Sequence, residues 1–367
     1  MTPYILLAAS VCLLAGLGGL LEKDARQQRE RVGIADPSGG GLRASYFDWL
    51  AIAALICFAG LRYEVGTDYV TYVSIFNSLS LTDWWAELGE SPQELGFTAL
   101  MLATKAATGT PKTVFWIAAI LTVLPTYAIL KRYSAYPAFS VALFVLLTYV
   151  TSFNVVRQGV AVALMFWAWS FLGRKTKWFV VLTVTAAAMH ISAVFAALAF
   201  MIAYKWRFNW RSAGIIAAVA VAVTVLAEAT SVVSSFLEFF NPRYGAYLQS
   251  DETGLGAYLM IAAFVVLLLY AVLVGSAGSP MTDEDQQFAV YLLIGIAFMV
   301  AGTQAGVVFR MGYYFLPFAL LLVPNRIART RDSALSGTLI LAGASTYYLA
   351  HLASFGDVIP YQTYLSF

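Results

Sequence analysis

Four arginines lie at the ends of apolar segments. The basic loops described below assign these ends to the outer side of the membrane. They are Arg62, Arg157 in SFNVVRQG, Arg243 in NPRYGAY and Arg310 in VVFRMGYYF. Positively charged residues are disfavoured on that side. Because the planar guanidinium fork grips phosphate oxygens in pairs, converging arginines predict a diphosphate site. The alternative for each arginine is a contact with lipid phosphates or with a loop carboxylate.

One of the two histidines interrupts a long apolar run. His190 lies in TVTAAAMHISAVF. A neutral imidazole accepts a proton from a sugar hydroxyl near neutral pH, which makes His190 a candidate general base. The alternative is a buried histidine that hydrogen-bonds a neighbouring helix. His351, near the end of the last apolar segment, is interpreted as an interfacial side chain without a chemical role.

The stretch LRYEVGTDYVTYVSIF, residues 61–76, combines groups that suit carbohydrate binding. Gly66 permits a tight reversal of the chain, and Asp68 is able to accept hydrogen bonds from hydroxyl groups or to pair with an arginine. Tyr69 and Tyr72, three residues apart, fall on one face of a helix and are predicted to stack on sugar rings. The alternative is an N-capped interfacial helix with an aromatic belt.

Motifs for other chemistries do not occur in the sequence. It has no His/Cys spacing typical of zinc, no P-loop, no nucleophile elbow and no kinase signature. The acidic residues of loop 63–95 form no recognised cation-binding pattern, so neither a metal nor a cofactor is expected. Cys12 and Cys57 lie within apolar runs and are interpreted as small buried hydrophobes. A net charge of only +2 argues against a nucleic-acid partner.

The composition requires a solvent other than water. Of the 367 residues, 60% are hydrophobic and 11% are charged, and the mean hydropathy is +0.76. Soluble globular proteins carry about 25% charged residues. In lipid the backbone must satisfy its own hydrogen bonds, and the apolar runs are long enough to do so as helices. The sequence therefore predicts an all-α integral membrane protein with a single polytopic domain over residues 1–367.

Twelve apolar stretches predict about twelve membrane crossings. They are residues 3–21, 48–61, 96–109, 113–130, 138–152, 158–172, 178–204, 212–228, 255–275, 288–306, 311–325 and 335–352. Basic residues mark the connections that stay in the cytoplasm. In chain order these connections are 22–46, 131–132, 173–177, 205–211 and 326–331. They determine the side of the membrane on which every other loop lies.

The positions of the basic connections add two constraints. An even number of crossings must separate the first two connections, so the stretch 96–109 is predicted to be a half-buried or interfacial helix. An even number must also separate the third and fourth connections, although these enclose only one apolar run, 178–204. Two short helices that meet near residues 189–191 satisfy this rule. His190 then lies at the outer end of a hairpin.

An ordered set of motifs resembles the EpsG-like family. The motifs are RYEVGTDYVTY, QELGF, NVVRQGVA, AAAMHISAVF, RYGAY and RMGYYF, in that order. The resemblance runs from about residue 45 to residue 325, and no single motif is decisive. The residues that match the family pattern are Arg62, Gly66, Asp68, Tyr72, Glu94, Arg157, Gln158, His190, Arg243, Tyr247 and Arg310.

The resemblance implies a function. Members of this family are Wzy-type polymerases of bacterial exopolysaccharide and O-antigen, similar in architecture to the multi-helix, GT-C-like membrane glycosyltransferases. They join oligosaccharide repeat units carried on undecaprenyl diphosphate, which serve as donor and acceptor, at the periplasmic face of the bacterial inner membrane. No cofactor is implied. A chain-length regulator and a flippase are the implied protein partners.

The resemblance also gives the matching residues expected roles. His190 or Asp68 is expected to be the base that activates the acceptor hydroxyl. The arginines are expected to stabilise the leaving diphosphate. From their shared placement on the outer face against the charge bias, Arg62, Arg157 and Arg310 are predicted to approach one another. The candidates for diphosphate binding are Arg62, Arg157, Arg310 and Arg243. The candidates for sugar binding are Tyr69, Tyr72, Glu94, Gln158, Tyr247 and Tyr313.

Three other functions stay open on the sequence alone. An O-antigen ligase uses the same donor with a lipid A-core acceptor. A deletion strain that accumulates single capped repeats favours a polymerase, whereas full-length polymer left on the carrier favours a ligase. A flippase or transporter is expected to show paired discontinuous helices in two related halves, and no repeated halves are visible. A structural scaffold would not need arginines on the outer face.

Overall fold

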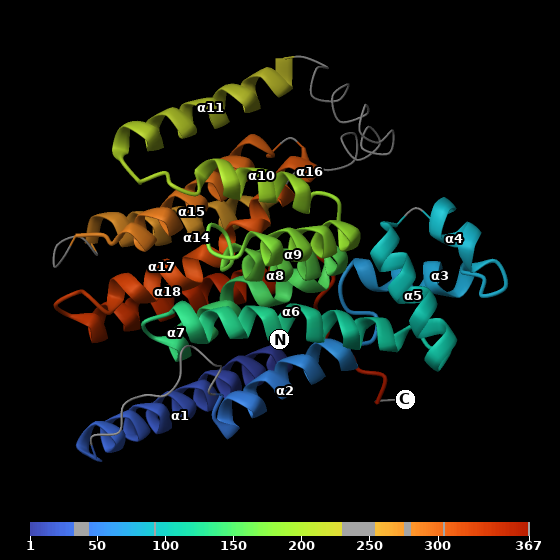
Figure 1. The fold of residues 1–367 in the computed structure, drawn as a ribbon, viewed down its shortest axis with the longest axis horizontal. Helices are drawn as coiled ribbons and strands as arrows, with labels where there is room; N and C mark the ends of the chain where they lie inside the picture. The colour runs from blue at the N-terminus through green and yellow to red at the C-terminus, as the bar shows by residue number, and fades with distance from the viewer. Residues whose placement is uncertain (33–43, 92, 230–253, 275–279, 304, 366–367) are drawn as a thin grey trace. The chain divides into compact units, whose positions relative to one another are not determined.

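The protein is helical throughout its described part (Figure 1). The computed structural model describes residues 1–32, 44–91, 93–229, 254–274, 280–303 and 305–365. Every regular element within these ranges is a helix, and the β interaction found there is an isolated bridge between Arg62 and Thr363. The prediction of an all-α protein is confirmed.

Five helices in the described ranges are long and apolar enough to cross a membrane. A helix needs about 20 residues to span a hydrocarbon core of about 30 Å. The five stretches are Thr2–Leu21, Lys112–Tyr133, Leu255–Leu273, Asp283–Ala301 and Gly306–Ile327. The other apolar helices are shorter. The chain therefore has the helices of a membrane-embedded protein, while about twelve crossings and a GT-C-like architecture stay predictions.

The chain divides into two compact units. The first contains Met1–Ala197 together with Phe355–Phe367, and the second contains Leu198–Ser354. The C-terminal segment therefore belongs with the N-terminal helices despite the distance between them in the sequence. The single domain expected over the whole chain stays a prediction.

In the first unit, five helices pack one against the next in the order α1, α2, α6, α8 and α9 (Figure 1). Their bounds are α1 Thr2–Val32, α2 Tyr46–Leu61, α6 Lys112–Tyr133, α8 Val156–Trp169 and α9 Thr176–Met189. Helix α2 starts at a capping box, in which Ser45 and Asp48 each accept a hydrogen bond from the other's backbone N–H. The buried Asp48 carboxylate also accepts hydrogen bonds from Tyr127 (2.6 Å) and Lys131 (3.1 Å), which ties α2 to α6.

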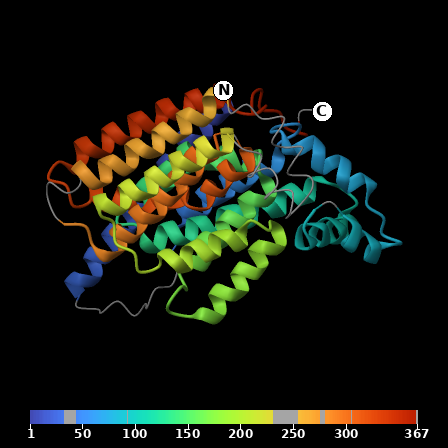
Figure 2. The same cartoon turned by 90° about the horizontal axis from the view of Figure 1, so that it is seen from above.

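Three shorter helices form a group at one end of the first unit (Figure 2). They are α3 (Asp68–Ser78), α4 (Trp84–Glu90) and α5 (Leu95–Thr108). Gly109 ends α5 in the left-handed conformation that glycine adopts without strain. At 1.5 Å per residue, the 14 residues of α5 measure about 21 Å, which is too short for a full crossing. This length agrees with the prediction that 96–109 does not cross fully.

A π-helical turn leads into the segment before α8. Helix α7 (Pro137–Phe144) continues into a π turn at Val145–Tyr149 and a 3₁₀ turn at Val150–Phe153. The hydroxyl of Tyr149 donates a hydrogen bond of 2.7 Å to the carbonyl of Leu55 in α2. π turns inside helices are frequent at functional sites. The irregular stretch ends α7 early and sets where α8 begins.

The long apolar run 178–204 forms two helices, as predicted. Helix α9 ends at Met189, and α10 spans Ala193–Ala203. His190 between them has an extended backbone, with φ −157° and ψ 116°. The break therefore falls within the residues that the charge rule predicted, and His190 lies in it.

The second unit is a set of helices with one buried ionic cluster. Its helices include α11 Trp210–Ala229, α14 Leu255–Leu269, α15 Asp283–Ala301, α16 Gly306–Met311, α17 Ala319–Ile327 and α18 Ser333–Ser354. Helix α15 starts at a capping box formed by Thr282 and Asp285. The buried Asp285 carboxylate pairs with Arg329 and lies 3.7 Å from Arg326. Two arginines therefore neutralise the acidic start of α15. Arg326 lies in the last turn of α17, and Arg329 follows that helix.

Candidate active site

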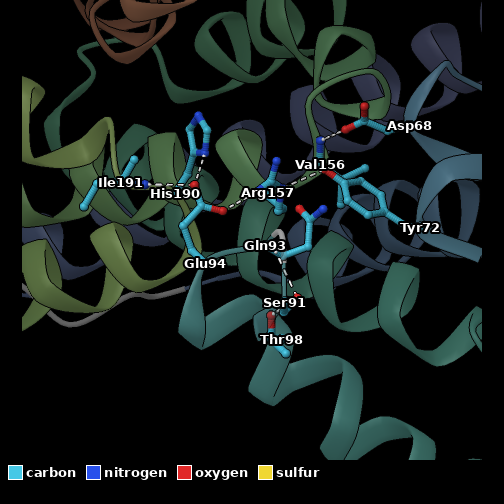
Figure 3. Close-up of polar contacts among 10 residues, drawn as sticks. All are labelled: Asp68, Tyr72, Ser91, Gln93, Glu94, Thr98, Val156, Arg157, His190 and Ile191. Atoms are coloured by element: carbon cyan, nitrogen blue, oxygen red, sulfur yellow. Dashed lines mark hydrogen bonds and ion pairs between the residues drawn. The ribbon is translucent and has the colours of Figure 1, made fainter. Parts of the chain in front are cut away.

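Polar side chains from four segments of the first unit come together (Figure 3). Asp68 and Tyr72 belong to α3, Glu94 precedes α5, Arg157 is in the first turn of α8, and His190 follows α9. All five were candidates from the sequence. Charged groups are scarce in this chain, so their concentration from such distant positions marks a candidate active site.

The carboxylate of Glu94 is the centre of this cluster. Its Oε1 lies 2.8 Å from Nδ1 of His190 and accepts a hydrogen bond of 3.2 Å from the backbone N–H of Ile191. Its Oε2 accepts a hydrogen bond from Nη1 of Arg157, with which it forms an ion pair. One carboxylate therefore orients both the imidazole and the guanidinium. The side chains of Glu94, Arg157 and His190 keep 17%, 22% and 20% of their surface exposed, so a ligand is able to reach them.

A second set of hydrogen bonds extends from Arg157 to Asp68. Nε of Arg157 donates a hydrogen bond of 2.9 Å to the hydroxyl of Tyr72, and that hydroxyl also hydrogen-bonds Asp68. Asp68 accepts a further hydrogen bond, of 2.9 Å, from the backbone N–H of Val156. These contacts hold α3 against the start of α8. They leave Nη2 of Arg157 without a hydrogen bond to any residue that the structure describes.

The cluster favours an ionised Glu94, which lies outside the five candidate spans. Burial alone would raise the pKa of this carboxyl. The hydrogen bond with His190 and the positive charge of Arg157 together outweigh burial and lower the pKa from its ordinary 4.5 to about 2. Glu94 is therefore a carboxylate at neutral pH, able to accept the hydrogen bonds described above.

The lowered pKa of Glu94 predicts a pH-dependent contribution to stability. Because the folded carboxyl binds a proton less tightly than the unfolded one, this contribution is complete above pH 4.5 and is lost as the pH falls towards about 2. The Glu94→Gln variant lacks the contribution at every pH. The melting temperature of the wild type should exceed that of Glu94→Gln at pH 6, and the gap should narrow by pH 3. A gap that stays constant or widens on acidification would contradict the assignment.

Two glycines permit the close packing on which the cluster depends. Gly66 has φ +87°, and a Cβ there would lie 2.7 Å from the carbonyl oxygen of Phe153. A Cβ on Gly96, in the first turn of α5, would lie 2.7 Å from the carbonyl oxygen and 2.8 Å from the Cβ of Ala188. Gly96 therefore allows α5 to touch the end of α9. This contact places Glu94 beside His190.

Replacing Gly96 with alanine should push α5 away from α9. Both opposing atoms are on the backbone or are a Cβ, so the clash cannot be relieved by a side-chain rotation, and overpacking of this kind typically costs about 1–3 kcal/mol. Thermal unfolding in detergent should show a clear fall in melting temperature. The matched control is Gly89→Ala in α4, where a Cβ meets no atom within 4 Å. Equal melting temperatures for the two variants would show that the close approach is unimportant.

Arg62 occupies a buried pocket next to the cluster. Its side chain is 4% exposed, and its guanidinium carbon lies 5.0 Å from the centre of the Phe115 ring and 4.5 Å from that of Phe153. Nε of Arg62 has no hydrogen-bond partner within the described part of the chain. The pocket is small and partly open, and it is lined mainly by α6, with Ala59 of α2 and residues at and before the start of α8. The carboxylate of Asp68 interacts electrostatically with both Arg62 and Arg157, so two predicted arginines lie near one carboxylate.

The remaining predicted arginines and two tyrosines are elsewhere. Arg310 in α16 and the buried Tyr313 that follows it belong to the second unit. Their convergence with Arg62 of the first unit stays a prediction. Arg243 and Tyr247 lie outside the described residues.

Some side chains predicted to bind sugar are buried against protein. The ring of Tyr69 is 4% exposed and stacks on Phe115, with 4.5 Å between centroids and 10° between planes. Tyr72 is 6% exposed and Gln158 is 4% exposed. Stacking of these groups on sugar rings stays a prediction, whereas their packing against neighbours is a feature of this structure.

Sequence reasoning missed several groups in and near the cluster. The backbone N–H of Ile191 was not considered, because a backbone donor gives no signal in a sequence. Gln93 precedes Glu94 in QELGF, and its buried Oε1 has no hydrogen-bond partner among the described residues. Asn154 opens NVVRQGVA and hydrogen-bonds two other segments. The described residues include no group of three His, Cys, Asp or Glu side chains placed to hold a metal, and independence from metals stays a prediction.

Comparison with known proteins gives one match. No curated protein and no solved structure matches the chain. A family model described as the EpsG family matches residues 45–363. This range leaves out α1 and the last four residues, and it includes every residue of the cluster around Glu94.

Proposed function

The chain belongs to the EpsG family, and from this membership we propose that it is a polysaccharide polymerase acting on lipid-linked repeat units. The family indicates a polymerase-like role in polysaccharide synthesis. The proposed reaction moves a glycan from its lipid diphosphate onto a hydroxyl of a second lipid-linked repeat. The observation that carries the proposal is the pair of Glu94 and His190, which is a base held by a carboxylate beside an arginine.

His190 is the proposed general base. Nδ1 of its ring is engaged by Glu94, so Nε2 is the nitrogen left to accept the proton of the acceptor hydroxyl. Glu94 fixes the orientation of the ring and stabilises the imidazolium that forms, as the third member of a nucleophile–base–carboxylate arrangement does. The activated oxygen then attacks the anomeric carbon of the donor sugar. The bond from that carbon to the diphosphate breaks, and the diphosphate leaves with the electron pair.

The two first-unit arginines are the proposed stabilisers of the leaving diphosphate. Arg157 offers Nη2, which has no hydrogen bond within the described residues, next to the base. Arg62 offers a buried guanidinium whose Nε lacks a hydrogen-bond partner within the described part of the chain. Preorganised donors in a site of low polarity stabilise developing negative charge more than donors in water do.

The proposed setting follows from the family. The donor and acceptor are proposed to be undecaprenyl-diphosphate-linked oligosaccharides, with the site facing the periplasm of a bacterial inner membrane. Asp68 is the second candidate base, but its carboxylate is engaged by the backbone of Val156 and by Tyr72. These contacts favour His190 for proton transfer and Asp68 for holding α3 in place.

The decisive experiment is synthesis of polymer from a purified, lipid-diphosphate-linked repeat unit. The detergent-solubilised wild-type protein should produce a ladder of lengthened products without nucleotide, and Glu94→Gln should produce far less. Transfer of preformed polymer only to lipid A-core, with no lengthening of the repeat unit, would indicate a ligase instead. Movement of the lipid-linked unit across vesicles without any new glycosidic bond would indicate a flippase.

A further inference from the structure

The C-terminal segment lies across the loop that carries the start of the site. After α18 the chain returns to the first unit, where the segment 356–364 pairs with the backbone of 61–66. The carbonyl of Asp357 accepts a hydrogen bond of 3.0 Å from Gly66, and the carbonyl of Gln362 accepts one of 2.9 Å from Tyr63. We call residues 356–364 the C-terminal strap.

Side chains fix the strap to three other helices. The hydroxyl of Tyr4 in α1 donates a hydrogen bond of 2.5 Å to the carbonyl of Val358, which is 1% exposed. The hydroxyl of Tyr361 donates one of 2.6 Å to the carbonyl of Phe58 at the end of α2. Nε1 of Trp116 in α6 donates one of 2.8 Å to the hydroxyl of Tyr364. The strap is therefore a docked part of the first unit.

Asn154 connects the strap to the loop before α3. Its Oδ1 accepts a hydrogen bond of 3.1 Å from the backbone N–H of Thr67, and its Nδ2 donates one of 2.9 Å to the carbonyl of Gly356. The side chain is 7% exposed, so water does not readily replace either contact. An amide carries an acceptor oxygen and a donor nitrogen at fixed spacing, and here the oxygen accepts from Thr67 while the nitrogen donates to Gly356.

Asn154 and its partner Thr67 lie close to the site residues in the chain. Thr67 precedes Asp68, whose carboxylate accepts from Val156, and Arg157 follows Val156 in the chain. Asn154 itself lies two residues before Val156. The amide thus joins both chain segments that must meet for Asp68, Tyr72 and Arg157 to interact. The same loop is held from its other side by the strap, through Gly66.

We infer that Asn154 is a positioning residue of the site and that it acts by keeping the C-terminal strap docked on the loop 62–67. It touches no reacting group in the proposed mechanism, and this inference rests on the proposed function. With the strap docked, the loop presents Asp68 to the N–H of Val156 and Tyr72 to Arg157. With the strap released, the loop loses the hydrogen bond from Gly66 to Asp357, and Asn154 loses its hydrogen bond to Gly356.

The test uses the full-length protein and the Asn154→Asp variant. Aspartate keeps an acceptor for Thr67 but turns the donor towards Gly356 into a second oxygen, so it opposes docking of the strap while conserving size. Strap release is measured by the rate at which a thiol reagent modifies Val358→Cys in a background without Cys12 and Cys57. Loss of one buried hydrogen bond should raise this rate by about 10- to 100-fold. Asn209→Asp, at a loop of the second unit, is the matched control.

Turnover is measured on the same proteins with the purified lipid-linked repeat unit. Asn154→Asp should lower kcat per folded molecule by about 10-fold or more, while the KM for the donor stays near wild type. Unchanged labelling of Val358→Cys would overturn the inference. So would faster labelling with unchanged kcat per folded molecule, which would indicate a merely structural role. Failure of the wild type to form polymer would overturn the proposed function, and the labelling would still report whether Asn154 holds the strap.

Discussion

Replacing His190 with alanine should lower the rate of polymer formation by about 10²–10⁴-fold, the usual contribution of a positioned general base. The donor should bind almost as well as to the wild type, because the base meets the acceptor hydroxyl and not the diphosphate. Donor binding is measured directly, and turnover is followed as polymer formed per folded molecule. The expected result is a protein that binds its donor but does not transfer the glycan to an acceptor.

The other histidine of the chain supplies the control for this prediction. His351 lies in α18 of the second unit, stacks on Tyr347 and is 2% exposed. His351→Asn should retain turnover per folded molecule even where it lowers the melting temperature. A well-folded His190→Ala protein that polymerises at the wild-type rate would remove His190 from the mechanism. The base would then have to be Asp68.

Arg62→Met should abolish most activity without destabilising the protein. Methionine retains an unbranched apolar stem between the rings of Phe115 and Phe153 and removes a buried Nε–H that has no partner in the described ranges. Removing the buried guanidinium also removes its desolvation cost, which offsets the loss of its contacts with the two rings and of its attraction to Asp68. If Arg62 stabilises the leaving diphosphate, loss of its donors should cost about 3–4 kcal/mol in the transition state, which is about 10²–10³-fold in kcat/KM for the donor.

Two further variants separate charge from geometry at this position. Arg62→Lys keeps a positive charge but loses the planar fork, so its kcat/KM should fall between those of the wild type and Arg62→Met. Arg207→Ala is the control, because the side chain of Arg207 forms an exposed pair with Asp283 in the second unit, and such pairs contribute little. Wild-type activity of a stable Arg62→Met protein would exclude Arg62 from diphosphate binding.

The sequence predicted those features that depend on the positions of basic residues and on the lengths of the apolar runs. Basic residues on both sides of the run 178–204 required two helices, and the structure places the break at His190. Composition required an all-helical protein. Motif order placed Glu94, Arg157 and His190 among the candidate residues, and the structure brings these three together.

Pairings between distant residues were beyond the sequence. Glu94 and His190 meet across 96 positions because Gly96 lets α5 approach α9, and nothing in the spacing of QELGF shows which side chains its carboxylate selects. The arginines were expected to act alike, since the charge rule assigns only a side of the membrane. In the structure Arg157 is paired with a carboxylate, whereas Arg62 lies between two aromatic rings contributed by other segments.

The break between α9 and α10 depends on a residue that is distant in the sequence. The residues around it, AAAMHISAVFAAL, contain neither proline nor glycine, and alanine and methionine favour a continuous helix. A distant carboxylate interrupts that helix instead, because Glu94 binds the ring of His190 and satisfies the N–H of Ile191, which would cost several kcal/mol if left bare in hydrocarbon. A continuous helix over the run 178–204 would carry the ring of His190 and the N–H of Ile191 away from the Glu94 carboxylate. Glu94 therefore keeps α9 and α10 separate as well as orienting His190.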